Sequence, residues 1–255
     1  MSEDERTQGI SKSKAEVLSD RIYRTPIFYI AAFSAAAGAA FCLLVFLIML
    51  IFGLRIHTDR DVNDNMLRYF GIMNNGGAVF GTIYAPEGVS GIVIGDTVKF
   101  SDGSKYKGEI KGLLFEGQGS YTSPEGDVYK GSFVNGLLVG DGEILYADGS
   151  TFSGKFENGK RNGYGEYTAK DGSSYKGNYE NDEKSGYGVF TYSDGSVYSG
   201  YFKNDMRHGQ GSYRFACRDS YTGEFRNNVI WGKGSYFFAS GRVYAGEFRN
   251  GVPVN

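Results

Sequence analysis

Residues 129–151 read YKGSFVNGLLVGDGEILYADGST, and residues 152–174 repeat the pattern as FSGKFENGKRNGYGEYTAKDGSS. Aromatic residues and glycines return at the same places after 23 residues. A fixed period of this kind is typical of repeat proteins, in which each copy packs mainly against its neighbours. The sequence therefore predicts an array of similar units rather than one globular core.

One aromatic column and three glycine columns run through the C-terminal part of the chain. The first column is aromatic in every copy: Tyr106, Tyr129, Phe152, Tyr175, Tyr198, Tyr221 and Tyr244. A glycine stands two residues later in all seven copies, and a Gly-x-Gly pair follows in each of the six full copies. Nineteen glycines in three columns without an exception are not an effect of composition.

The columns indicate β-strands, because positions 1, 3 and 5 of a copy share one face of a strand. That face reads aromatic, glycine, aromatic, while polar residues such as Lys130 and Ser132 occupy the other face. A glycine inside a strand costs about 0.5–1 kcal/mol relative to alanine. We therefore expect aromatic rings to lie flat over these glycines, where a Cβ atom would exclude them.

Turn sequences divide each copy into a hairpin. Asn135-Gly136 suits the bend after the first strand and Asp148-Gly149 the turn before the next copy. In one copy we expect strands at Tyr129–Val134 and Gly142–Ala147. The expected fold is all-β: an elongated, single-layer antiparallel meander of about 12–13 strands.

Four substitutions depart from the turn pattern. Asp182, Asp205 and Asn228 replace the glycine of the first bend, and Asn and Asp tolerate the same positive φ. Arg218 replaces the turn glycine of the fifth copy, so that connection is expected to be the least regular.

Composition excludes several classes of protein. The chain has 27 Lys+Arg against 29 Asp+Glu, a formal charge of −2, which excludes a strongly basic nucleic-acid-binding protein. Cys42 and Cys217 are its two cysteines, too few for a disulfide framework or a cysteine-based metal site.

Residues 27–54 contain no charged residue, and a helix of this length exceeds the roughly 30 Å hydrocarbon thickness of a bilayer. The sequence predicts a transmembrane helix here. The alternative is a cleaved signal peptide, whose apolar region is about 7–15 residues long.

Basic residues set the expected orientation. Near the helix, four of them precede it (Lys12, Lys14, Arg21 and Arg24) and three follow it (Arg55, Arg60 and Arg68), which favours a cytoplasmic N-terminus and places the C-terminal domain outside the cytoplasm. No Asn after residue 54 begins an Asn-x-Ser/Thr sequence, which fits a bacterial exterior or a cytosolic domain equally well.

The repeated Tyr-x-Gly…Gly-x-Gly units resemble MORN repeats, named for membrane occupation and recognition nexus. The resemblance covers residues 106–251. Together with the uncharged run, it indicates four parts of the chain: a polar tail (1–26), the transmembrane helix (27–54), a juxtamembrane segment with a degenerate capping repeat (55–105), and a MORN-repeat array (106–255) with six full copies and a partial seventh. Val62, Met66 and Phe70 are spaced for a short amphipathic helix within 55–76.

The sequence offers no chemistry for catalysis. His57 and His208 are its two histidines, the acidic residues form no metal-ligand pattern, and no Gly-Lys-Ser/Thr follows the Gly-x-Gly units. Some enzymes carry repeats similar to these, but their catalysis lies in separate domains. We expect neither a catalytic residue nor a cofactor or metal.

The expected function is that of a membrane-anchored scaffold or protein-interaction module with a protein partner or self-association. The first aromatic column is the candidate interaction surface. The alternative is direct binding of a lipid headgroup or a glycan. Residues 96–255 carry 19 Lys+Arg and 20 Asp+Glu, so the array has no net attraction for anionic lipid unless its cations cluster.

Overall fold

The computed structural model describes residues 54–60, 66–74, 77–84 and 89–254. The polar tail and the expected transmembrane helix at 27–54 lie outside the described residues, except for Leu54, where the first strand begins. None of the described segments forms a helix suited to crossing a bilayer.

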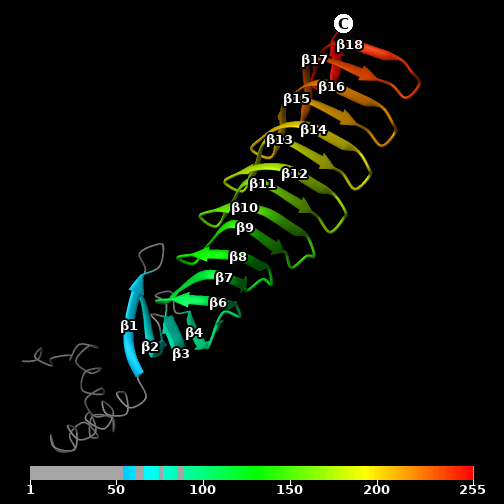
Figure 1. Ribbon diagram of the computed structural model, residues 1–255. Coiled ribbons are helices and arrows are strands. Elements are labelled where there is room, and N and C mark those ends of the chain that lie inside the picture. Colours follow the sequence, from blue (N-terminus) through cyan, green and yellow to red (C-terminus); the bar gives the residue numbers. More distant parts are fainter. Residues whose placement is uncertain (1–53, 61–65, 75–76, 85–88, 255) are drawn as a thin grey trace, which may run out of the picture. The chain divides into compact units, whose positions relative to one another are not determined.

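All regular structure in the described residues is β-strand, and it forms one antiparallel sheet of 19 strands. Each strand pairs with the next one along the chain, as Figure 1 shows from β1 to β18. The strands are β1 Leu54–Arg60, β2 Met66–Asn74, β3 Gly77–Tyr84, β4 Ser90–Ile94, β5 Thr97–Phe100, β6 Lys105–Lys111, β7 Leu114–Thr122, β8 Val128–Val134, β9 Leu137–Leu145, β10 Thr151–Glu157, β11 Lys160–Thr168, β12 Ser174–Glu180, β13 Glu183–Thr191, β14 Val197–Lys203, β15 Met206–Arg214, β16 Ser220–Arg226, β17 Val229–Phe237, β18 Val243–Arg249 and β19 Val252–Val254.

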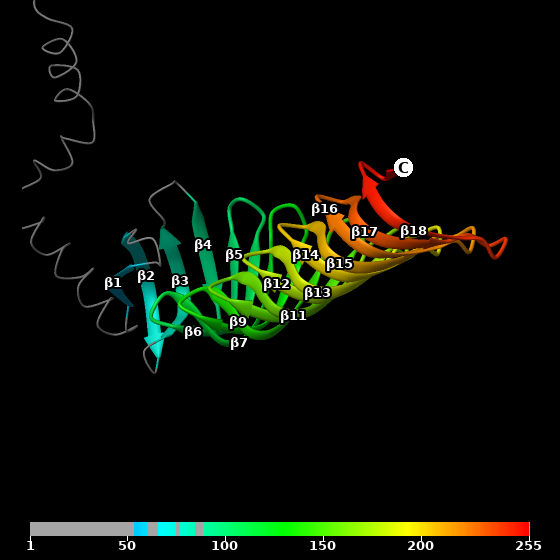
Figure 2. The ribbon, with the colours of Figure 1, turned by 90° about the horizontal axis from the view of Figure 1, so that it is seen from above.

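The hairpins of the repeat are confirmed, but the second strand of the copy at 129–151, β9, runs from Leu137 to Leu145 and not from Gly142 to Ala147. It begins directly after the bend. Gly140 has a φ of 70°, and the β8–β9 register shifts between Gly131 and Ser132. A β-bulge with glycine at positive φ lets the strand bend and continue, and the hairpins curve accordingly (Figure 2).

The bulge explains why most first-column residues are tyrosine. In the β12–β13 pair the register shifts between Gly177 and Tyr179, and the intervening Asn178 keeps a carbonyl that accepts the Tyr175 hydroxyl at 3.0 Å. Tyr198 donates in the same way to the carbonyl of Tyr201 at 2.9 Å. The hydroxyl thus supplies a partner at the irregular point of the ladder.

Aromatic rings lie over the column glycines, as the sequence predicts. A Cβ atom added to Gly211 would lie 2.6 Å from the Tyr198 hydroxyl, and one added to Gly188 would lie 2.6 Å from Cε2 of Tyr175. Both tyrosines are fully buried. The glycines therefore make room for the core of a sheet that has a single layer.

Edge-to-face contacts between rings join successive copies. The Tyr198 ring lies 5.1 Å from Phe202 in its own copy and 5.0 Å from Phe225 in the next, with interplanar angles of 90° and 80°. Tyr221 continues the series to Phe225 and Phe248 at 5.3 and 5.2 Å. Each such pair contributes about 0.5–1.5 kcal/mol beyond its buried area, so the copies stabilise one another.

The substituted turns keep the backbone of the glycine turns. Asp182, Asp205 and Asn228 have φ values of 74°, 63° and 70°, which confirms that Asp and Asn take the positive φ. Arg218 has a φ of 72°, and its N–H donates to the Phe215 carbonyl at 3.0 Å. The fifth connection is therefore regular in shape, although its residue is unusual.

The expected amphipathic helix within 55–76 is wrong, because this region contains β1 and β2. Burial alternates along β2: Leu67 and Tyr69 are buried, whereas Met66 and Phe70 are 45% exposed. A period of two residues is that of a strand. The Tyr69 ring lies over Gly81, and its hydroxyl donates to the Phe80 carbonyl at 2.6 Å, so β2 and β3 repeat the tyrosine-over-glycine arrangement of the array.

Candidate functional site

The described residues place few reactive side chains together. His57 lies on β1 and His208 on β15, and Cys217 is exposed. In this part of the chain no three His, Cys, Asp or Glu side chains are close enough to hold a metal ion. The remaining candidates are surfaces for binding.

The first aromatic column, expected to be an interaction surface, lies mostly inside the protein. Five of its seven rings are buried: Tyr106, Phe152, Tyr175, Tyr198 and Tyr221. Burial also raises the pKa of the Tyr106 and Tyr198 hydroxyls to about 12. Tyr129 and Tyr244 are partly exposed. The sheet's own glycines and neighbouring rings cover this column, so a contact surface has to be sought elsewhere.

Tyr129 differs from the other members of the column. A Cβ atom added to Gly142 would lie 3.0 Å from Cδ2 of Leu138 and from the Phe156 ring, so these two side chains take the place that the tyrosine ring has in other copies. The Tyr129 ring lies instead 6.0 Å from that of Tyr121.

Three tyrosines stand out on the opposite face of the sheet. Tyr164 on β11, Tyr187 on β13 and Tyr201 on β14 are each 53% exposed, and we call them the tyrosine patch. Tyr187 is directly opposite Tyr201 in the β13–β14 register, with ring centroids 5.9 Å apart. Tyr164 and Tyr187 are the middle residues of their Gly-x-Gly units, and this alternation was the signal from which the patch could have been predicted.

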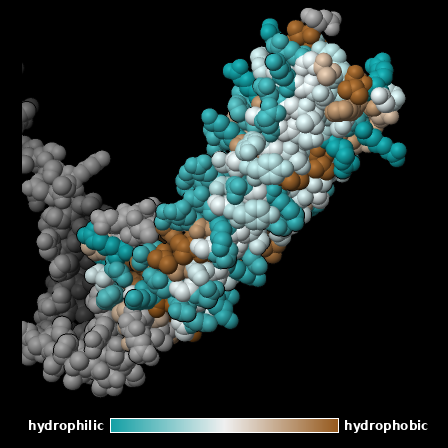
Figure 3. Space-filling model, turned by 45° about the horizontal axis from the view of Figure 1, so that its top comes forward, coloured by the Kyte–Doolittle hydropathy of each residue, from teal (hydrophilic) through white to brown (hydrophobic). Residues whose placement is uncertain are grey.

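Charged pairs flank the tyrosine patch. Lys176 bonds Glu166 at 2.8 Å, and Lys155 bonds Asp141 at 2.8 Å, all four with exposed side chains. Exposed pairs of this kind contribute about 0–1 kcal/mol and are easily exchanged for contacts with another molecule. On the face seen in Figure 3, polar and near-neutral residues predominate and hydrophobic residues occur in separate spots.

A second cluster lies on the aromatic face. Arg161, Lys184 and Arg207 hold the same position in three successive copies and form what we call the cation row. The β-ladder pairs Arg161 with Phe156 and Arg207 with Phe202, so these cations share a face with the buried rings. Arg161 lies 4.9 Å from the centroid of the Tyr179 ring, within the range of a cation–π interaction.

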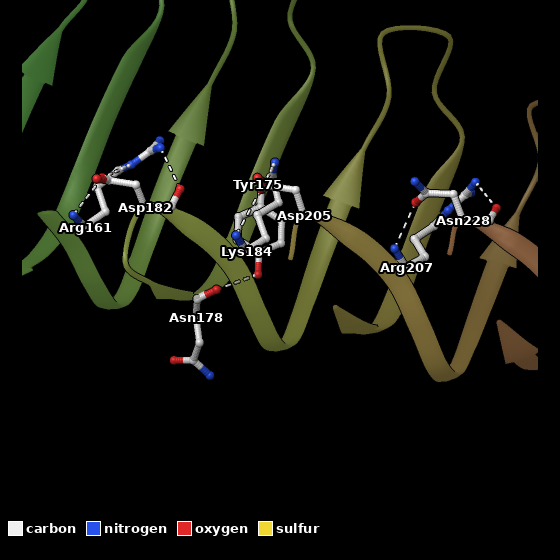
Figure 4. A network of polar contacts seen from close by, with 8 residues as sticks. All are labelled: Arg161, Tyr175, Asn178, Asp182, Lys184, Asp205, Arg207 and Asn228. Atoms are coloured by element: carbon white, nitrogen blue, oxygen red, sulfur yellow. Dashed lines mark hydrogen bonds and ion pairs between the residues drawn. The ribbon is translucent and has the colours of Figure 1, made fainter. Parts of the chain in front are cut away.

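Two members of the cation row are neutralised by the next copy. Arg161 Nε donates to Asp182 Oδ1 at 3.1 Å, and Lys184 Nζ lies 3.1 Å from Asp205 Oδ1 (Figure 4). Burial raises the pKa of Asp205, but hydrogen bonds from the Lys184 backbone and ammonium, together with the charges of Lys184 and Arg161, hold it below its ordinary value. Both ion pairs therefore also fasten adjacent bends.

Arg207, the third member, faces an amide. Its backbone N–H donates to Asn228 Oδ1 at 2.9 Å and its Nη2 donates to the Asn228 carbonyl at 2.7 Å. Its Nε is buried without a hydrogen-bond partner in the described part of the chain. The Arg207 side chain thus has hydrogen bonds, but none of the described residues places a carboxylate in an ion pair with it.

The pairing within the cation row was missed from the sequence because its partners belong to different copies. A signal exists in residues 21 apart. The six pairs are Phe115 with Gly136, Leu138 with Gly159, Arg161 with Asp182, Lys184 with Asp205, Arg207 with Asn228, and Ile230 with Gly251. An apolar residue is followed 21 residues later by glycine, and a cation is followed by Asp or Asn.

Hairpins of 23 residues joined edge to edge into one sheet define a repeat protein built from β-hairpin copies. The family model of the MORN repeat matches residues 106–128, 129–151, 152–174, 175–197, 198–216, 221–241 and 244–254. These matches cover more than half of the chain, which therefore belongs to the MORN-repeat family.

Solved structures with some likeness include the TCP domain of SAS-4 (dCPAP) of Drosophila melanogaster in complex with a proline-rich motif of Ana2 (dSTIL). It is 13% identical, covers 58% of this chain and 74% of its own, and has a TM-score of 0.33. A mutant TCP10 domain of Danio rerio CPAP is 12% identical, covers 76% and 95%, and has a TM-score of 0.32. No match is found among curated proteins.

Proposed function

We propose that this chain is a non-enzymatic, single-pass membrane protein whose MORN-repeat sheet acts as a scaffold or protein-interaction module. The observation that carries the proposal is the tyrosine patch. Tyr164, Tyr187 and Tyr201 are half exposed on three strands within one ladder of the sheet. Tyrosine supplies a large contact area and loses little conformational entropy on binding, which makes it frequent in binding surfaces.

The membrane part of the proposal rests on the sequence. The 28 uncharged residues at 27–54 are long enough to span a bilayer, and the basic residues around them favour an array outside the cytoplasm. Ala32, Ala36 and Ala40 have the four-residue spacing that allows close helix–helix approach, so self-association through the anchor belongs to the proposal.

The test is chemical cross-linking in native membranes, followed by purification of the full chain and mass-spectrometric identification of attached proteins. A variant with Tyr164→Ser, Tyr187→Ser and Tyr201→Ser is expected to lose about tenfold or more of the captured partner. A matched control changes Lys130, Glu143 and Thr222, which are exposed in other copies, to Ser. Recovery of neither a partner nor a second copy with the unchanged chain would contradict the proposal.

A second candidate is binding of a glycan, because exposed tyrosine rings can stack on sugar rings. Lipid-headgroup binding receives less support, since Arg161 and Lys184 are already paired with carboxylates. Liposome and polysaccharide binding by residues 55–255 distinguishes these from a protein scaffold, which is expected to bind neither.

A further inference from the structure

The three cations of the row have nearly the same backbone hydrogen bond to the next copy, but they differ in whether the accepting side chain carries a negative charge. Asp182 Oδ1 accepts the Arg161 N–H at 2.9 Å, Asp205 Oδ1 accepts the Lys184 N–H at 3.0 Å, and Asn228 Oδ1 accepts the Arg207 N–H at 2.9 Å. Asn228 therefore makes the same backbone contact as the two aspartates. What the asparagine lacks is the negative charge.

The six copies provide an internal comparison for this difference. Where the position is apolar, as in Leu138 and Ile230, the residue 21 further on is glycine and no charge is present. Where it is a cation, an oxygen acceptor follows, and it is a carboxylate for Arg161 and Lys184. Arg207 alone among these described pairs combines a cation with a neutral acceptor.

The aromatic rings around Arg207 strengthen the attraction between its guanidinium and a carboxylate. Its guanidinium carbon lies 5.2 Å from the Tyr213 ring centroid, 5.6 Å from Phe225 and 5.7 Å from Tyr198. Rings stabilise a cation without neutralising it. Because they also exclude water on one side, a carboxylate beside this guanidinium would be held more strongly than at an open surface. Arg207 is partly exposed as a residue, although its Nε is buried, so we expect another molecule to contact the guanidinium at its Nη atoms.

We propose that Arg207 binds a carboxylate from an acidic segment of a protein partner that lies on the aromatic face of the array. The planar guanidinium fits a carboxylate with two parallel hydrogen bonds, and the missing charge at Asn228 leaves this cation available. This inference rests on the proposed function, since it states the chemistry of the partner. It adds a binding position on the face opposite the tyrosine patch.

The first test measures the fluorescence anisotropy of a labelled peptide of alternating Glu and Ser, with the purified full chain in detergent. A peptide with Gln in place of Glu is the matched control and is expected to bind at least about tenfold more weakly. Asn228→Asp introduces the carboxylate that Asp182 already places beside Arg161, and it is expected to weaken binding of the Glu peptide by a similar factor. Arg207→Met is expected to do the same.

The Asn228→Asp variant also shows whether weaker peptide binding could result from misfolding of the protein. Since it completes an ion pair already present in two neighbouring copies, its melting temperature is expected to rise while its affinity for the peptide falls. Asp182→Asn is the opposite change: it frees Arg161 and is expected to strengthen peptide binding. Equal binding of the Glu and Gln peptides, or unchanged binding by Asn228→Asp, would overturn the inference.

Two further outcomes separate this inference from its alternatives. If glycerophosphoserine binds and Asn228→Asp abolishes it, while the Glu peptide does not bind, the site takes a lipid headgroup and the inference is wrong. In cross-linking from native membranes, a partner captured equally by the unchanged chain and by Asn228→Asp contradicts the inference and leaves the proposed function standing. Capture of nothing by the unchanged chain contradicts the proposed function, and the peptide measurement then decides the site.

Discussion

The carboxylate of Asp59 on β1 accepts the backbone N–H of Leu113, in the bend between β6 and β7, at 3.3 Å. In later copies the N–H at this place donates to a carbonyl of the preceding copy, as Gly136 does to Phe115 at 3.0 Å and Asp182 to Arg161 at 3.0 Å. The first full copy has no regular copy before it, and Asp59 supplies the missing acceptor. The segment before the array thus closes its N-terminal end in the way that terminal units of repeat proteins do.

Replacing Asp59 with Ala is expected to loosen the first hairpin. The Leu113 N–H loses its acceptor, at a cost of about 1 kcal/mol. Hydrogen exchange followed by mass spectrometry should show faster exchange in residues 105–122 and unchanged exchange in residues 220–249, because copies contact mainly their neighbours. Glu143→Ala, an exposed change on another strand, is the control. Equal exchange rates of residues 105–122 in the two variants would mean that Asp59 does not stabilise the first hairpin.

Replacing Gly211 with Ala is expected to destabilise the array by about 1–3 kcal/mol. The new Cβ atom would lie 2.6 Å from the Tyr198 ring, which is fully buried, so the ring or the backbone has to shift. Thermal unfolding followed by circular dichroism measures the effect. The neighbouring Ser212→Ala removes a hydroxyl from the other face and should change the melting temperature little; an equal loss in the two variants would contradict the role given to the ring.

Replacing Arg218 with Gly is expected to stabilise the protein by about 1 kcal/mol. Arg218 holds a φ of 72°, which costs an L-residue roughly 1–2 kcal/mol and costs glycine almost nothing. Arg214→Gly, within the adjacent strand β15, is the matched control and should destabilise. Denaturant unfolding measures the free energy of unfolding of the two variants. A loss of stability on Arg218→Gly would show that contacts of the arginine side chain outweigh the strain.

Tyr198→Phe is expected to change the response to alkaline pH. Burial raises the pKa of Tyr198 from 10 to about 12, so the native state holds this proton more tightly than the unfolded chain does. The resulting stability is complete below pH 10 and is lost as the pH rises from about 10 to 12. In the Phe variant this loss should be smaller. Phe152 holds the same column position, so the ring fits without its hydroxyl.

At neutral pH the same variant should be less stable by about 0.5–1.5 kcal/mol, because the Tyr201 carbonyl loses its hydrogen bond from Tyr198. Melting temperatures at pH 7 and pH 11 measure both effects. Tyr187→Phe, at a half-exposed ring, serves as control. An identical alkaline loss in the Tyr198→Phe variant and the unchanged chain would contradict the argument.

The repeat made the hairpins, the glycine columns and the covering rings predictable, because each of these features depends on residues within one copy. Two other features depend on contacts between segments that one 23-residue copy does not contain. The strand at Met66–Asn74 has apolar residues whose spacing also suits a helix, and pairing with Gly77–Tyr84 decides the matter. The ion pair of Arg161 with Asp182 forms only when neighbouring copies stack.

The candidate site shows the same division. The sequence placed the first aromatic column on one face, and the structure shows that glycines and rings of adjacent strands bury most of it. Tyr164 and Tyr187 lie on the other face, as the middle residues of Gly-x-Gly units in which only the glycines recur in every full copy. Exposure of a column thus depends on what the next strand places over it.

Cross-linking of the full chain in native membranes, with the attached residues identified by mass spectrometry, tests whether the array binds another protein. If the array is a protein-interaction module, links to another protein or to a second copy should form at Lys155 and Lys176, beside the tyrosine patch, and fall sharply in the triple Tyr→Ser variant. If links within the chain form but no intermolecular link appears at these lysines, the array is not a protein-interaction module.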